Sequence, residues 1–316
     1  MARASGQSER GDTPDGATIA PLPTGGTFAW TWAGRALSVG YDVHGQGDGA
    51  PVLFLPAMST VSTRAEMAGL ARRLSADKPA VAVDWPGFGD GPRPPLDYAP
   101  ELQRRFLEAF VDHLRATFGG GAVPVVAAGH AAGYALDLET RRPGSLARLA
   151  LVAPTWRGPL PTVMGGRRPV QAWIRRLVHL PVIGHALYRL NVMRPVVAAM
   201  YRGHVYGDPG RVTPELLNGR MRVVRRPGAR FASACFVTGA LDPFPDRAAF
   251  LEAARRVRAP MLVVYGSDTP PRSRAEMEAL AGLPGVERRV LDAGALGVHE
   301  ERPDAVAAAV GPFLRA

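Results

Sequence analysis

The stretch from Val123 to Leu138 constrains the fold more than any other part of the sequence. It begins with a run of small and apolar residues, 123–128, that is typical of a buried strand. Residues 129–133 then read Gly-His-Ala-Ala-Gly, and helical periodicity follows. A tight turn between a strand and a helix needs glycine where φ is positive or where two elements approach closely, because a Cβ atom would clash there. The stretch therefore predicts a strand, a sharp turn and a helix within an α/β sheet.

The turn matches the pattern of a nucleophile elbow, G-x-S-x-G, with Ala131 in the place of the serine. An elbow presents a nucleophile above the sheet, and a methyl group can neither attack a substrate nor be activated by a base. Three interpretations follow: an enzyme that works in another way, a fold that has lost its chemistry, or a coincidence of small residues.

Strand-like and helix-like segments alternate on both sides of this turn. Continuous apolar runs, typical of strands buried on both faces of a parallel sheet, occur at 51–55, 80–83 and 260–266, and 146–152 predicts another short strand. Two shorter runs, 27–32 and 36–41, predict an antiparallel hairpin at the edge. We therefore expect an α/β fold with a mostly parallel central sheet flanked by helices.

The alternation stops between residues 157 and 256, where helical segments follow one another. This predicts a helical cap at 157–256 inserted into a core of residues 27–156 and 257–316, after a disordered tail at 1–26. Apolar and basic residues interleave in the cap helices. The pattern fits a cap that packs its apolar side on the core, or a hydrophobic entrance with cationic rims for an acyl or isoprenoid-like ligand or an anionic membrane surface.

Composition limits the partners of the chain. The net charge of +10 comes almost entirely from arginine, with Lys78 as the single lysine, and no nucleic-acid-binding motif surrounds the arginine clusters. The single cysteine, Cys235, excludes an internal disulfide and a cysteine-based metal site. No apolar run reaches the roughly 18 residues of a membrane span. We expect no nucleic acid, metal or cofactor, and a cytoplasmic location with peripheral membrane contact as an alternative; the oligomeric state stays open.

Four motifs together resemble the α/β-hydrolase superfamily over nearly the whole chain after residue 26. They are the Gly-rich turn at 45–49, Asp84-x-Pro-Gly-Phe-Gly, the turn at 129–133 and the run from Pro260 to Gly266. The segment Ala-Pro-Thr-Trp-Arg-Gly-Pro-Leu-Pro that begins at Ala153 is similar to a hydrolase-like subgroup of photosynthetic organisms. That subgroup has no serine at the elbow, which implies that Ala131 is a family feature.

The resemblance implies a histidine base between the last strand and the last helix, and His299 lies there. The register differs, however. Aligning the run at 300–303, Glu-Glu-Arg-Pro, with the family places Leu296 in the base position, and counting from Gly294 places Ala295 there. This register favours a structural role for His299 over a catalytic one.

The acid is also shifted. The family pattern after the strand at 260–266 places Thr269 in register and Asp268 one residue early. Asp242 has the right spacing but precedes the wrong strand, and Asp84 is typical of a turn at a strand end. Asp268 and His299 are therefore the catalytic candidates, both out of register.

The loop after the strand at 51–55 departs from the family pattern. Ala57 and Met58 keep amide hydrogens that could form an oxyanion hole together with Ala132, the residue after the elbow position. Ser59 is more typical of a residue at a helix entry than of a substitute nucleophile. His130 is more typical of packing than of a base.

These observations predict an α/β-hydrolase with a degenerate triad and a small-molecule pocket under the cap. In one hypothesis, Asp268 and His299 form a shifted dyad that supports weak, non-serine hydrolysis of an apolar, ester-like substrate. In the alternative, the protein binds an apolar ligand or a partner without covalent chemistry.

Overall fold

The computed structural model describes residues 24–47 and 49–316. The tail was predicted at residues 1–26. Residues 1–23 lie outside the described residues, and residues 24–26 begin the first strand instead. Within the described part, eight strands form one sheet in the order β1-β2-β4-β3-β5-β6-β7-β8. Their bounds are β1 Thr24–Trp32, β2 Arg35–His44, β3 Val52–Leu55, β4 Ala80–Val83, β5 Val123–Ala128, β6 Leu146–Val152, β7 Met261–Gly266 and β8 Val286–Leu291.

The predicted hairpin forms one edge of the sheet. β1 and β2 pair antiparallel, from Thr24 opposite Val43 to Trp32 opposite Arg35. The two residues between them, Ala33 and Gly34, both have positive φ, as the tight turns of hairpins require. β2 then pairs antiparallel with β4, and the other strands pair parallel. The expectation of a mostly parallel sheet is confirmed.

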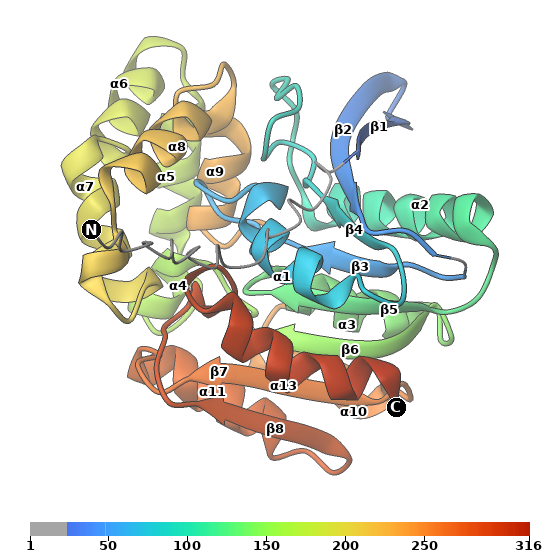
Figure 1. Ribbon diagram of the computed structural model, residues 1–316. Coiled ribbons are helices and arrows are strands. Elements are labelled where there is room, and N and C mark those ends of the chain that lie inside the picture. Colours follow the sequence, from blue (N-terminus) through green and yellow to red (C-terminus); the bar gives the residue numbers. More distant parts are fainter. Residues whose placement is uncertain (1–23, 48) are drawn as a thin grey trace, which may run out of the picture.

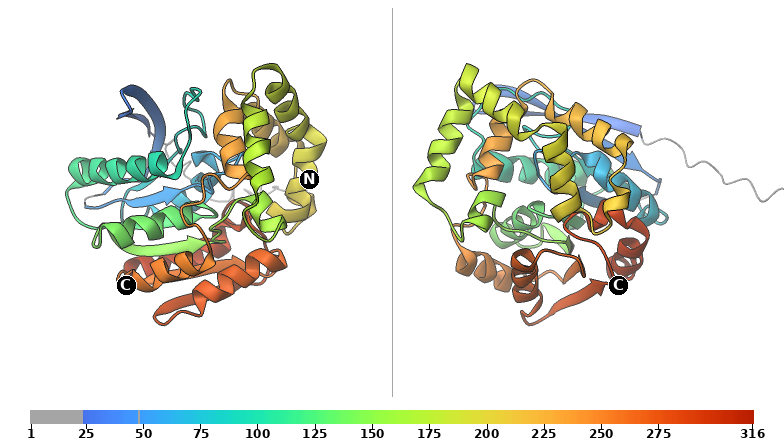
Figure 2. Two further views of the ribbon diagram at one scale, coloured as in Figure 1. Left: turned by 180° about the vertical axis from the view of Figure 1, so that it is seen from behind. Right: turned by 90° about the vertical axis from the view of Figure 1, so that its left-hand side faces the viewer.

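The central strands are apolar throughout because both faces of the sheet are covered. Every residue of β3, β4, β5 and β7 is buried. Helices α1 (Ala68–Leu74) and α13 (Pro303–Arg315) pack together on one face. The opposite face carries α2 (Pro100–Phe118), α3 (Ala131–Arg141), α10 (Arg247–Arg256) and α11 (Pro271–Ala281), as Figures 1 and 2 show.

Between β6 and β7 the chain forms helices at the end of the sheet toward which the parallel strands point (Figure 1). They are α4 Pro159–Val163, α5 Pro169–His179, α6 Val182–Asn191, α7 Arg194–Met200, the π-helical turn η2 Tyr201–Val205, the 3-10 turn η3 Pro209–Arg211, α8 Pro214–Val224 and α9 Ala229–Val237. Buried residues of α6 to α9 form a second hydrophobic cluster. α10 falls inside the range predicted for the cap but packs on α3 and α11 in the core.

Among the described residues, no helix is both long and apolar enough to cross a membrane. The loops that follow β3, β5, β6, β7 and β8 meet at the edge of the sheet under the cap helices. Two short elements lie in these loops: the 3-10 helix η1 (Arg64–Met67) after β3 and α12 (Val298–Glu301) after β8. In α/β sheets this edge is where ligands usually bind.

Candidate functional site

The turn after β5 has a glycine at its strained corner. Gly129 has a φ of +51°, and its N–H donates to Val152 O on the neighbouring strand at 3.0 Å. A Cβ atom at Gly129 would lie 2.9 Å from Cβ of Ala57, so the approach of the loop after β3 also excludes a side chain. In a nucleophile elbow the attacking residue occupies such a corner. Here the corner carries no side chain at all.

Ala131, expected at the corner from the sequence, lies beyond it. His130 already has helical dihedral angles, φ −69° and ψ −24°, and Ala131 is the first residue of α3 and fully buried. The elbow pattern matched Gly129 and Gly133, but the structure requires a glycine at these two positions for different reasons. A Cβ at Gly133 would lie 2.9 Å from Cγ of Pro243. The spacing of the glycines therefore does not locate the corner.

The backbone amides around the corner donate to acceptors inside the protein. Ala57 N–H donates to Oε1 of Glu66 at 2.6 Å, and His130 N–H donates to Ala57 O at 3.3 Å. Ala132 N–H donates to Gly129 O at 3.3 Å. An oxyanion hole needs amides that can donate to a substrate oxygen. We expected the amides of Ala57 and Ala132 to form an oxyanion hole, but both donate hydrogen bonds within the protein instead.

The next residues of the loop after β3 are also turned inward. Met58 is fully buried and has a φ of +52°. Such a conformation costs about 1 kcal/mol or more for a residue with a side chain, so the surrounding packing must maintain it. Ser59 Oγ lies 2.7 Å from Ser62 Oγ within the same loop. Met58 and Ser59 therefore stabilise the loop.

His299 contacts a carboxylate that the sequence analysis did not single out. Its Nε2 lies 3.3 Å from Oε1 of Glu66, and both side chains are at most 4% exposed. Burial alone would raise the pKa of Glu66, but the interactions with His299, Arg220 and the Ala57 amide outweigh burial and lower this pKa. Glu66 is therefore ionised, and His299 belongs to a buried structural cluster.

Arg220 connects the cap helices to this cluster. It projects from α8, is 5% exposed, and donates to Oε1 of Glu300 and, at 3.4 Å, to Val61 O. Its guanidinium lies 5.6 Å from the centre of the Tyr201 ring. These partners compensate the charge of an arginine that is almost out of reach of water.

Glu66 and Arg220 each had a signal in the sequence. Glu66 lies on the apolar side of the helical stretch that includes Met67, Leu70 and Leu74, and it is the charged residue on that side. Arg220 lies between Leu217 and Val224 on the buried side of α8. A charge on an apolar helical face predicts a buried partner, but the sequence does not say which one.

Asp268 and Thr269 hold the end of β7 to the loop after β8. Asp268 Oδ2 accepts the Gly294 N–H at 2.7 Å, and Asp268 N–H donates to Gly294 O at 3.1 Å. Thr269 Oγ1 donates to Gly266 O at 2.8 Å. Within the described residues, no hydrogen bond or ion pair joins Asp268 to His299. The two catalytic candidates therefore contact different partners, Asp268 the Gly294 amide and His299 the Glu66 carboxylate.

The loop after β8 is tied to the cap where the family places its base. Leu296 N–H donates to His204 O at 3.4 Å, and Gly297 N–H donates to Val205 O at 2.6 Å. Leu296, which the sequence alignment predicted in the base position, has no titratable group. The neighbouring Ala295 is buried.

A second buried pair lies next to the corner. His130 Nε2 is 3.6 Å from Oδ1 of Asp242 and 3.1 Å from Leu241 O, and the side chains of His130 and Asp242 are both 1% exposed. Asp242 Oδ1 also accepts the Gly158 N–H at 2.8 Å. Burial lowers the pKa of His130 to about 4 and raises the pKa of Asp242 to about 7. His130 is therefore neutral at pH 7, and the pair is closed to solvent.

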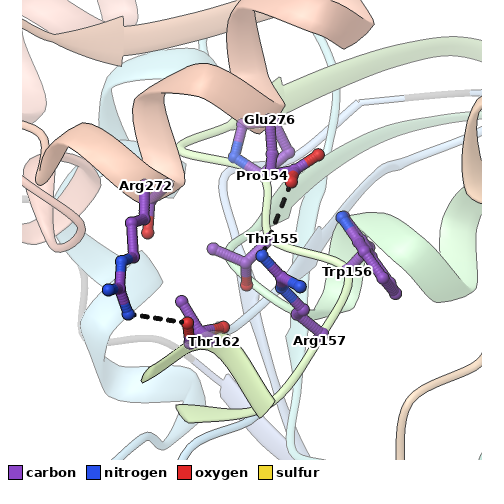
Figure 3. A pocket seen from close by; sticks show the side chains of 8 residues that line it. Pro154, Thr155, Trp156, Arg157, Thr162, Arg272 and Glu276 are labelled. Carbon is purple, nitrogen blue, oxygen red and sulfur yellow. Dashed lines mark hydrogen bonds and ion pairs between the residues drawn. The ribbon is translucent and has the colours of Figure 1, made fainter. Parts of the chain in front are cut away.

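A hollow beside the end of β6 is too small for a substrate. Figure 3 shows Trp156, Arg157, Arg272 and Glu276 around it, and its volume of about 10 Å³ is close to the space of one water molecule. Arg157 Nη2 lies 3.6 Å from Oε1 of Glu276. The segment that carried the subgroup resemblance lines this hollow.

A larger, open groove of about 510 Å³ lies between η2 and the loop that joins β7 to α11. His204 lines it from the cap, and Asp268, Thr269 and Arg274 line it from the core. Neither this groove nor the hollow is lined by the corner residue or by the loop after β3. Across residues 24–47 and 49–316, no three His, Cys, Asp or Glu side chains are placed to hold a metal ion.

The order of the eight strands, and the strand, turn and helix around Gly129, are those of the α/β-hydrolase fold. The sequence model of the Alpha/beta hydrolase family matches residues 43–309. The chain belongs to this family.

Several relatives are known. A haloalkane dehalogenase of Agrobacterium fabrum is 30% identical over 111 residues, which are 35% of this chain and 34% of that protein, so the match spans about a third of the relative's length. A solved haloalkane dehalogenase of Agrobacterium tumefaciens is similar with a TM-score of 0.68 and 19% identity, covering 92% of this chain and 96% of that one. A thermophilic esterase from Thermogutta terrifontis has a TM-score of 0.69 and 19% identity, covering 92% and 98%. At these identities the solved structures concern the fold alone.

Replacing Glu66 should show how strongly the buried cluster stabilises the fold. We expect Glu66→Ala to lower the free energy of unfolding by about 3 kcal/mol or more, because it leaves His299 and the buried Ala57 N–H without the carboxylate they contact. Glu66→Gln should cost less, since its amide oxygen can still accept from Ala57. Glu252→Ala, which removes an exposed carboxylate, is the control and should change stability by about 0.5 kcal/mol or less. Chemical denaturation measures all three; equal values for Glu66→Ala and Glu252→Ala would contradict the role of the cluster.

The pair of His130 and Asp242 should govern part of the pH dependence of stability. The raised pKa of Asp242 means that the folded state binds more protons than the unfolded state between about pH 4 and 7, so this group lowers stability as pH rises. The lowered pKa of His130 has the opposite effect between about pH 4 and 6.5. The two effects on stability oppose each other in the native protein. In Asp242→Asn the carboxyl no longer titrates, so only the effect of His130 remains.

We expect the stability of Asp242→Asn to rise between pH 5 and pH 7 by about 2 kcal/mol more than that of the native chain. Urea titrations at the two pH values measure this difference. Asp77→Asn, at an exposed loop position, should behave like the native protein. A pH dependence of Asp242→Asn that matches the native one would show that the carboxyl titrates in its ordinary range.

Proposed function

We propose that this member of the Alpha/beta hydrolase family does not hydrolyse substrates and acts by binding. One observation carries the proposal: the corner where a nucleophile would stand is Gly129, and the amides of Ala57 and His130 beside it donate within the protein. A substrate carbonyl at this corner would find neither an attacking group nor a free donor. We therefore assign the nucleophile position of the degenerate triad to Gly129, the acid position to Thr269 and the base position to Leu296.

The alternative is a shifted dyad of Asp268 and His299 that activates water. A base of this kind needs its acid within hydrogen-bond reach. Asp268 binds the Gly294 amide and His299 contacts Glu66, so each candidate already has a structural partner. These contacts support the non-catalytic hypothesis over weak, non-serine hydrolysis.

The groove between η2 and the β7–α11 loop is the best match to the predicted pocket under the cap. Its lining includes Asp268, His204 and Arg274, so a small molecule there would have to present polar groups. Pro270 and Pro271 add apolar surface, but the groove is open to solvent and does not enclose an acyl or isoprenoid-like ligand of the kind expected from the sequence. We therefore place apolar recognition on the outer surface of the cap.

The similarity to a subgroup of photosynthetic organisms that lacks the elbow serine belongs to the same proposal. The segment behind it contributes Trp156, which stacks on Phe250 with ring centres 6.0 Å apart, and Arg157, which lies over the Trp156 ring. These contacts give the segment a packing role beside the corner.

We propose a cytoplasmic location for the chain.

The absence of hydrolysis can be tested with the chemistry of the relatives. We expect the purified full chain to turn over no short or long acyl ester and no haloalkane above background, and to stay unlabelled by a fluorophosphonate. Ala131→Ser should also stay inactive, because the new hydroxyl would lie inside α3 and away from the corner. Gly129→Ser should lose stability, since its Cβ would clash with Ala57 at a positive φ.

Two outcomes would contradict the proposal. Turnover by the native chain that falls in Asp268→Asn would identify a working dyad. Fluorophosphonate labelling of Ala131→Ser would place the nucleophile position at Ala131 after all. Circular dichroism of each variant separates a lost fold from a lost activity.

A further inference from the structure

The outer side of the hairpin formed by α5 and α6 exposes a row of apolar side chains. Trp173 and Leu177 lie one turn apart on α5, and Trp173 is 63% exposed. Val182 and Ile183 form the tip of the hairpin and are 81% and 57% exposed. We call the set made of these four residues with Leu187 and Leu190 of α6 the α5–α6 stripe.

The inner side of the hairpin is already packed, so the stripe is not a core surface turned outward by chance. Tyr188 of α6 is buried and its hydroxyl donates to Val224 O at 3.0 Å. His179 Nε2 of α5 lies 3.4 Å from Phe231 O of α9. The inner side of the hairpin therefore contacts α8 and α9, while the stripe faces outward. A contiguous exposed apolar surface of this kind marks an interaction site.

The charge around the stripe has one sign. Residues 157–207 contain eight arginines and no aspartate, glutamate or lysine, a formal charge of +8. Arg157 and Arg167 pair with carboxylates of other segments. Arg175, Arg176 and Arg189 of the hairpin have no carboxylate within 4.0 Å among the described residues. Asp97 of a neighbouring loop acts on His179 at the inner side.

We propose that the α5–α6 hairpin docks on the surface of an anionic phospholipid bilayer. The stripe would enter the boundary between head groups and acyl chains, with Trp173 at the depth that indole rings prefer. The arginines beside it would meet lipid phosphates, each contributing about a fivefold gain in binding. Figure 1 shows α6 at the end of the molecule remote from β8, so no core element obstructs a flat surface there. The proposal holds whether or not the corner at Gly129 is catalytic.

Other occupants fit the surface less well. In a symmetric dimer the same patch meets itself, so arginines of one copy would face arginines of the other without intervening carboxylates. Nucleic acid would satisfy the arginines but would leave Val182, Ile183 and Leu187 against a phosphate backbone. A bilayer satisfies both the charge and the apolar row.

Flotation with vesicles tests the proposal on the full chain. At 0.1 M salt we expect binding to vesicles of equal parts phosphatidylglycerol and phosphatidylcholine, and at least about fivefold weaker binding to phosphatidylcholine alone. Val182→Ser with Ile183→Ser should weaken binding about tenfold or more. Arg176→Gln with Arg189→Gln should weaken it by a similar factor and reduce its dependence on salt.

Matched controls lie on β8. Val290→Ser replaces an apolar side chain that is 50% exposed, and Arg288→Gln replaces an exposed arginine. Both should bind like the native chain. Equal binding to the two kinds of vesicle, or stripe variants that behave like these controls, would overturn the proposal. Lipid-free dimerisation abolished by Val182→Ser with Ile183→Ser would assign the stripe to a second copy, and displacement from vesicles by duplex DNA would assign it to nucleic acid.

Discussion

The carboxylate of Glu66 is removed from water and joins three segments that are distant in the sequence. It accepts the Ala57 amide from the loop after β3, contacts His299 after β8, and interacts with the charge of Arg220 from the cap. A buried charge is tolerated only when its partners are all in place, because a single missing partner costs several kcal/mol. The loop, α12 and the cap therefore adopt their positions together.

This arrangement stabilises the fold with the same groups that an active relative needs for its reaction. The Ala57 amide donates to Glu66, so it cannot donate to an oxyanion, and the Ala57 side chain lies against the corner where a nucleophile would need a Cβ. Catalytic sites usually retain strained or unpaired groups that reduce stability. Here the corner retains its positive φ at a glycine, where that conformation costs little, and the amides of Ala57, Gly129 and His130 donate within the protein.

Much of the fold could be predicted from the sequence, because burial on both faces makes β3, β4, β5 and β7 continuous apolar runs. The site was harder to predict. The spacing of Gly129 and Gly133 predicted the corner at Ala131, whereas the positive φ of Gly129 and the helical dihedral angles of His130 place it at Gly129. The partners of His299 and His130 are long-range contacts without a local pattern, which is why Glu66 was missed.

The edge of the sheet and the cap thus have opposite properties. At the edge, where this fold usually binds ligands, the corner at Gly129 has no side chain, and the Ala57 and Leu296 amides donate to acceptors within the protein. The cap has its own hydrophobic cluster, including Tyr188 and Val197, and does not need the stripe to hold its shape. Exposed apolar residues such as Val182 gain nothing from folding and carry a solvation cost in water. Their retention beside unpaired arginines is explained if the cap surface has become the site of recognition.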